Sequence, residues 1–172
     1  MAPPIQSHDS PDTAPDDSVA EKPWPGRILA IDLGERRIGL AVSDPLGITA
    51  QGLPTLERRN QQQVLAHVRS LADRYEVSLV LVGNPINMNG TESRQSEKAR
   101  AFASDLEQHL NLRTLLWDER LTTVEAQRVL DESGEPKHRQ AEAVDRLAAV
   151  LLLQNYLDSQ RCGTPSPPES EP

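Results

Sequence analysis

The sequence is poor in cysteine and aromatic residues, and each shortage narrows the possibilities. Cys162 is the only cysteine in 172 residues, which excludes an internal disulfide framework and argues against a cysteine-based metal site. Aromatic residues make up 3% of the chain, so the core must be aliphatic. Hydrophobic and charged residues make up 37% and 26%, as is typical of one globular domain of this length.

Long hydrophobic runs are missing as well. The longest apolar stretch, at residues 147–153, is far shorter than the roughly 18 apolar residues of a membrane span. The first residues lack the basic and apolar segments of a signal peptide. We therefore expect a cytoplasmic protein that has no membrane partner.

Both ends of the chain are rich in Pro, Ser, Asp and Glu and have little to bury. This composition is typical of disorder. We expect disordered tails at residues 1–25 and 161–172, on either side of one folded domain at residues 26–160.

The formal net charge of -8 is unevenly divided. Residues 1–26 hold five acids and one base (-4), and residues 161–172 hold two acids and one base (-1). The remainder is 26 - 7 = 19 acids against 18 - 2 = 16 bases, or -3. Most bases are arginine, whose planar guanidinium suits phosphate oxygens. The domain is compatible with a phosphate-rich partner, although ordinary solvated arginines explain the counts equally well.

Hydrophobic patterning predicts five strands and four helices. The predicted strands are residues 27–33, 37–43, 48–56, 77–83 and 112–117, and the predicted helices are residues 60–75, 91–110, 122–131 and 140–159, with a polar loop at 133–139. Three strands in a meander, followed by alternating helices and strands, predict an α/β fold: a mixed five-stranded sheet with helices on both faces.

Three acids occupy positions that do not suit ordinary surface acids. Asp32 ends the first predicted strand, Glu119 follows the fifth, and Asp145 lies on the apolar side of the last helix. A lone carboxylate is costly there, whereas Mg²⁺ or Mn²⁺ would compensate it with a positive charge and prefers oxygen ligands. Two such ions can activate water for phosphodiester hydrolysis.

Structural roles explain the same three acids without a metal. Asp32 could close a turn, Glu119 could cap a helix, and Asp145 could pair with an arginine such as Arg120 or Arg146. Composition and spacing leave these alternatives open.

The adjacent acids Asp118 and Glu119 raise a question of register. If strand alternation persists, Trp117 and Glu119 lie on one side of the sheet and Asp118 lies on the other. Glu119 is then the expected ligand, and Asp118 takes its place only if the register slips by one residue.

Four stretches resemble motifs of the YqgF/RuvX family in order and spacing. They are DLGERRIGLAVSD at 32–44, VGNPINMNGTE at 82–92, DERLTT at 118–123, and the segment 137–157 around VDRLAA. The resemblance spans residues 27–158 and implies an RNase H-like fold. It also implies cleavage of a phosphodiester backbone, either at the 5′ end of pre-16S rRNA or, as in the related Holliday junction resolvases, in branched DNA.

By motif position, the resemblance places the catalytic acids and the Mg²⁺ or Mn²⁺ ligands at Asp32, Glu119 and Asp145. The candidate substrate-binding residues are Arg36, Arg37, Asn87 and Arg120. The chain departs from the family pattern at Asn84, where Leu is usual, and at Asn89, where Asp is usual. Both departures fall in the segment after the fourth strand, where they could alter substrate contact.

Two other functions remain open from the sequence. The "DLG" turn also occurs in sugar kinases and actin-like ATPases, but those proteins enclose a nucleotide between two such domains, and this chain has length for one. An RNA-binding ribosome-assembly factor with structural acids is the non-enzymatic alternative. Either a monomer or a homodimer is compatible with the sequence.

Overall fold

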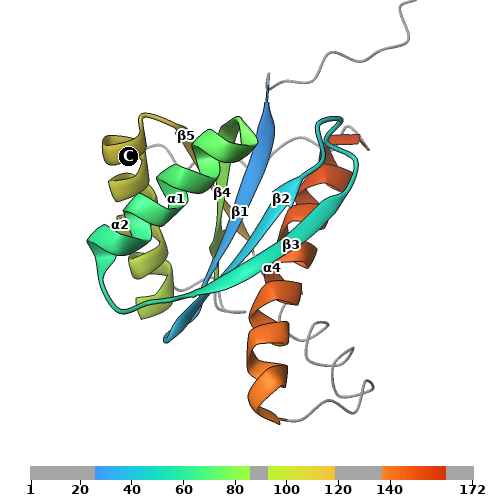
Figure 1. Cartoon of the computed structure of the whole chain (residues 1–172). Coiled ribbons are helices and arrows are strands. Elements are labelled where there is room, and N and C mark those ends of the chain that lie inside the picture. The colour runs from blue at the N-terminus through green and yellow to red at the C-terminus, as the bar shows by residue number, and fades with distance from the viewer. Residues whose placement is uncertain (1–25, 86–92, 119–136, 162–172) are drawn as a thin grey trace, which may run out of the picture.

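A computed structural model describes residues 26–85, 93–118 and 137–161 (Figure 1). The described elements are β1 (Arg27–Leu33), β2 (Arg37–Ser43), β3 (Ala50–Glu57), α1 (Gln61–Tyr75), β4 (Val77–Asn84), α2 (Arg94–Leu110), β5 (Arg113–Asp118) and α4 (Lys137–Arg161). The predicted helix at 122–131 and both predicted tails, apart from Arg161, lie outside the described residues. Among the described helices, none is long and apolar enough to cross a membrane.

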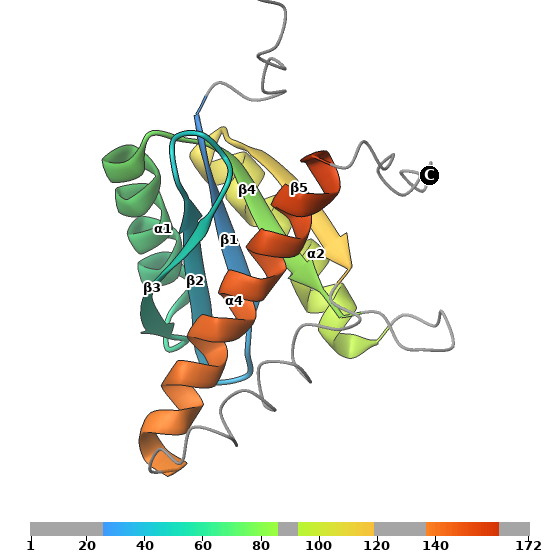
Figure 2. The same cartoon turned by 90° about the vertical axis from the view of Figure 1, so that its right-hand side faces the viewer.

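The five strands form one mixed sheet in the order β3-β2-β1-β4-β5. The pairs β1–β2 and β2–β3 are antiparallel, and β1–β4 and β4–β5 are parallel. The helices α1 and α2 cover one face and α4 crosses the other (Figures 1 and 2). The predicted fold class and strand order along the chain are confirmed.

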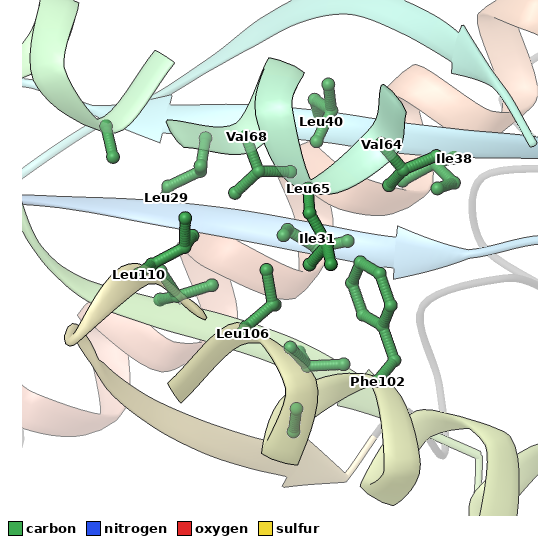
Figure 3. Close-up of a cluster of buried hydrophobic side chains, with 14 of the residues drawn as sticks. Leu29, Ile31, Ile38, Leu40, Val64, Leu65, Val68, Phe102, Leu106 and Leu110 are labelled. Carbon is green, nitrogen blue, oxygen red and sulfur yellow. The ribbon is translucent and has the colours of Figure 1, made fainter. Parts of the chain in front are cut away.

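Alternation along the strands divides the interior into two cores. The α1/α2 core takes its largest side chains from β1, β2 and the two helices, among them Leu29, Ile31, Ile38, Leu40, Val68 and Phe102 (Figure 3). The α4 core lies on the opposite face and contains Ile28, Ala30, Ala41, Leu81, Leu152 and Leu153. Nearly every central-strand residue is therefore buried, which explains why β1 reads as a continuous apolar run until Asp32.

Several boundaries differ by a residue or more, and three elements begin two or three residues from their predicted starts; two of these three shifts have a visible cause. The strand expected from residue 48 begins at Ala50, because the Asp44 carboxylate accepts hydrogen bonds from the Ile48 and Thr49 N–H groups and holds them in a turn. The helix expected from residue 91 begins at Arg94, because Ser93 caps it by accepting from the Ser96 N–H. The last helix begins at Lys137, within the expected polar loop.

The buried Asn84 at the end of β4 is tied to α2. Its side-chain oxygen accepts a hydrogen bond of 2.7 Å from the Ser96 hydroxyl, and both residues are buried. Leucine, the usual residue of the family at this position, could not accept that bond. The departure from the family pattern is thus matched by a polar partner on α2.

We expect Ser96→Ala to lower the free energy of unfolding by about 1–3 kcal/mol, because it leaves the buried Asn84 oxygen without its donor. The double variant Asn84→Leu/Ser96→Ala should be close to wild type, since it removes both polar groups. Urea unfolding of wild type, both single variants and the double variant measures the coupling. Additive losses in the double variant would contradict this account.

Candidate active site

Asp32 lies at the carboxyl end of the central strand β1, on the side that faces α4. Ile28 and Ala30 belong to the α4 core, and successive side chains of a strand alternate between the two faces. Asp32 therefore shares their face, and it is only half-buried. A carboxylate at this point is carried by rigid backbone and still reaches solvent.

A glycine opposite Asp32 brings the backbone of the second acid, Asp145, to the same end of the sheet. Asp32 pairs with Gly39 across the antiparallel β1–β2 ladder, and directly paired residues project to the same face. A Cβ atom on Gly39 would lie 2.0 Å from the backbone oxygen of Asp145. The backbone of α4 thus rests on the residue opposite Asp32, which places Asp145 at the same end of the sheet.

Asp145 is held by an ion pair with Arg37. The Arg37 Nε donates to Asp145 Oδ2 at 2.8 Å, and the two side chains are 33% and 24% exposed. The hydrogen bond to Asp145 raises the pKa of Arg37 above its ordinary value, so the guanidinium stays charged. Arg37 and Gly39 are two residues apart on β2 and share a face. Among the described residues, Arg37 rather than Arg146 pairs with Asp145, and Arg120 lies outside them.

Of the two adjacent acids, the structure places Asp118, the last residue of β5. Trp117 packs with the α4 core and lies against Tyr156 of α4, with ring centroids 5.0 Å apart. Asp118 pairs in register with Asn84, whose side chain is bonded to α2 on the opposite face. Asp118 therefore projects toward the α2 side, away from the face of Asp32. Continued alternation would return Glu119 to the face of Asp32, but Glu119 lies outside the described residues.

Of the remaining predicted substrate contacts, the structure describes Arg36. Arg36 is exposed in the turn between β1 and β2, directly past Asp32. Asn87 and Arg120 lie outside the described residues. In the part of the chain that is described, no three His, Cys, Asp or Glu side chains form a group that could hold a metal ion. Two of the three predicted ligands, Asp32 and Asp145, belong to that part.

Comparison with known proteins identifies the family. Residues 26–159 match the RuvX family, which is described as Holliday junction resolvase. The chain belongs to the RuvX family. This membership classes it among the nucleases, which are hydrolases of phosphodiester bonds.

Curated relatives in the RuvX family are similar over nearly their whole length. A protein of Koribacter versatilis is 55% identical over 133 residues, covering 77% of this chain and 87% of the relative. A protein of Clostridium botulinum is 46% identical over 133 residues, covering 77% and 97%. Each carries the name "Putative pre-16S rRNA nuclease".

Solved structures support the fold. The RuvC protein of T. thermophilus in complex with Holliday junction substrate aligns with a TM-score of 0.53 at 15% identity, covering 83% of this chain and 99% of that one. A second structure of Thermus thermophilus RuvC gives a TM-score of 0.50 at 15% identity, covering 80% and 97%. The RNase H-like fold expected from the motifs is confirmed.

Sequence reasoning missed two features: Arg37 pairs with Asp145, and the backbone of α4 packs directly against Gly39. One signal was available: Arg37 and Gly39 lie at alternate positions of β2, so they face the same neighbour. The position of α4 along β2 could not be predicted, because no local sequence pattern reports it.

We expect Gly39→Ala to destabilise the fold by about 1–3 kcal/mol, because the added methyl group would overlap the backbone of α4 and push it away. Gly52→Ala is the matched control on β3, where the added Cβ meets side-chain atoms of Arg146 that can move. Chemical unfolding should show a clearly larger loss for Gly39→Ala. Equal losses in the two variants would contradict the close backbone contact.

Proposed function

We propose that the chain is a metal-dependent nuclease that trims the 5′ end of pre-16S rRNA in the cytoplasm. Its membership in the RuvX family and the names of relatives that are 46% and 55% identical support this substrate. The enzyme acts on structured RNA during ribosome biogenesis, as a monomer or a homodimer.

One observation carries the catalytic assignment: Asp32 and Asp145 come from distant parts of the chain to the same end and the same face of the sheet. Neither position is needed for solubility, and both carboxylates are only partly exposed. Arg37 compensates the charge of Asp145, and a divalent ion would add positive charge at the same end of the sheet. A nuclease site provides a reason for the arrangement.

The donor set fits a hard divalent cation. Carboxylate oxygens from one or two side chains, completed by water and phosphate oxygens, are the ligands that Mg²⁺ prefers, and Mn²⁺ accepts oxygen ligands too. Asp32, Asp145 and Glu119 would hold it. A bound ion at such a site activates water and stabilises the leaving oxygen in phosphodiester hydrolysis.

The other residues of this proposal position the reactants. Arg37 donates to one oxygen of Asp145 and so fixes the carboxylate, whose other oxygen can serve as a ligand. Arg36, in the turn past Asp32, together with Asn87 and Arg120, would contact backbone phosphates. Phosphate contacts of this kind set the position of a strand without reading its sequence.

Branched DNA is the second candidate substrate, favoured by the family description and by the fold shared with RuvC. Non-catalytic RNA binding in ribosome assembly is the third candidate. A cleavage assay separates the three. It compares a pre-16S rRNA fragment that keeps its 5′ extension with a four-way DNA junction, each with Mg²⁺, with Mn²⁺ and with neither.

We expect the RNA to be cut only when a divalent ion is present. Asp32→Asn should slow cleavage by more than about a hundredfold, which exceeds the effect of losing a residue that only hydrogen-bonds to a metal ligand. Its circular dichroism and unfolding midpoint should remain near wild type. Preferential cutting of the junction would favour the second candidate. Full activity of Asp32→Asn would contradict the proposed site.

The adjacent acids provide a matched pair of variants. Glu119→Gln should abolish cleavage, because the side chain faces Asp32 if alternation continues beyond β5. Asp118→Asn removes a neighbouring charge of the same sign but faces α2, so it should retain most of the activity. Initial rates of RNA cleavage measure both variants. The reverse result would show that Asp118 is the ligand.

A further inference from the structure

A pocket of about 360 Å³ opens on the α1/α2 side of the sheet. It lies where β3 ends and α1 begins, beside the first half of α2, and its lining includes residues from β2, α1 and α2. Pockets of this volume are large enough for a small organic ligand. None of the proposed catalytic residues lines it.

The floor of this pocket is apolar. Ile38 of β2, Val64 of α1 and Phe102 of α2 line it, and each is at least nine-tenths buried. The three side chains lie together toward the carboxyl end of β1 (Figure 3). Since little of these three side chains is exposed, the apolar surface open to a ligand is that of the neighbouring Ala101, which is exposed and also lines the pocket.

The rim of the pocket is mainly basic. Arg58, Arg59 and Lys98 line it, and Asp105 is the only acid among its lining residues. Arg59 also pairs with Glu57, but the two side chains are 80% and 61% exposed. An ion pair this exposed contributes little stability and can exchange for a phosphate. The rim therefore offers cationic donors above an apolar floor.

Arg58 connects the pocket to the candidate active site. Its backbone N–H donates to the Arg36 oxygen at 2.9 Å, and its Nη1 donates to the Gly34 oxygen at 3.4 Å. Both acceptors belong to the turn that directly follows Asp32 and Leu33. A strand whose phosphate reaches Asp32 can continue around this turn to the other face of the sheet.

We propose that this pocket holds one unpaired nucleotide of the RNA. This inference rests on the proposed function, which supplies the RNA substrate. The base lies against Ala101, where the amide NH2 of Asn60 and the amide oxygen of Gln61 can meet its polar edge. The other amide atoms of these two residues cap α1 and bond Asp105. The phosphate binds Arg59 and Lys98. An unpaired base is the form of RNA whose face and edges a protein can reach.

The test measures binding in an Asp32→Asn background, so that cleavage does not interfere. Fluorescence anisotropy compares a labelled RNA that has an unpaired segment beside a helix with a fully paired RNA of the same length. Arg59→Gln/Lys98→Gln should weaken binding of the unpaired RNA about tenfold and lower the salt slope by about 0.7, the contribution of the one single-strand phosphate contact that the two side chains share. Arg74→Gln/Arg113→Gln removes the same charge far from the pocket and should change both quantities little.

Ala101→Phe tests the floor without a change of charge. Ala101 is exposed and lines the pocket, so a phenyl group there should fill the space. We expect this variant to lose the preference for unpaired RNA and keep its affinity for paired RNA. Its unfolding midpoint should match that of Ala101→Gln, which serves as the control for fold.

Three results would overturn the pocket proposal. The first is equal weakening by the two charge variants, and the second is an unchanged preference in Ala101→Phe. The third is binding of free nucleoside monophosphate as tight as binding of RNA, which would make the pocket a site for a small effector. Because binding is measured without cleavage, failure of the proposed function would appear separately, as absence of cutting by wild type.

Discussion

The position of α4 depends on residue 39 having no side chain. The backbone oxygen of Asp145 occupies the place of a Cβ atom on Gly39, so the helix lies closer to β2 than any other residue would permit. This contact sets the height of α4 above the sheet and hence the reach of Asp145. A small residue in the sheet thus determines the geometry of an acid more than a hundred residues later in the chain.

The ion pair of Arg37 with Asp145 follows from that close packing. Once the helix backbone is held against β2, a carboxylate that faces the sheet must either be protonated or be compensated. Arg37 stands two residues before Gly39 on the same face and donates at 2.8 Å. Arg37 bonds one carboxylate oxygen of Asp145, and the proposed metal site would use the other.

Much of the fold could be predicted because strand alternation and helical periodicity are local properties of the sequence. The β1–β2 hairpin, the apolar run of β4 and the facing of Leu115 and Trp117 were all readable in this way. The first residues of β3 and α2 could not be predicted in this way, because individual hydrogen bonds to the side chains of Asp44 and Ser93 determine them. Patterning singled out the candidate acids and motif resemblance agreed with them, but neither could supply the partner of Asp145.

At the end of β1, the two faces of the sheet carry different charged groups. On the α4 face, Asp32 precedes the turn after β1, and Arg37 follows that turn and pairs with Asp145. On the α1/α2 face, Arg58 binds the backbone of the same turn. A net charge of -8 for the chain therefore says little about this end of the sheet. Local arrangement, with Asp32 and Asp145 on one face and Arg58, Arg59 and Lys98 on the other, would allow an acidic protein to hold a cation and a phosphate backbone together.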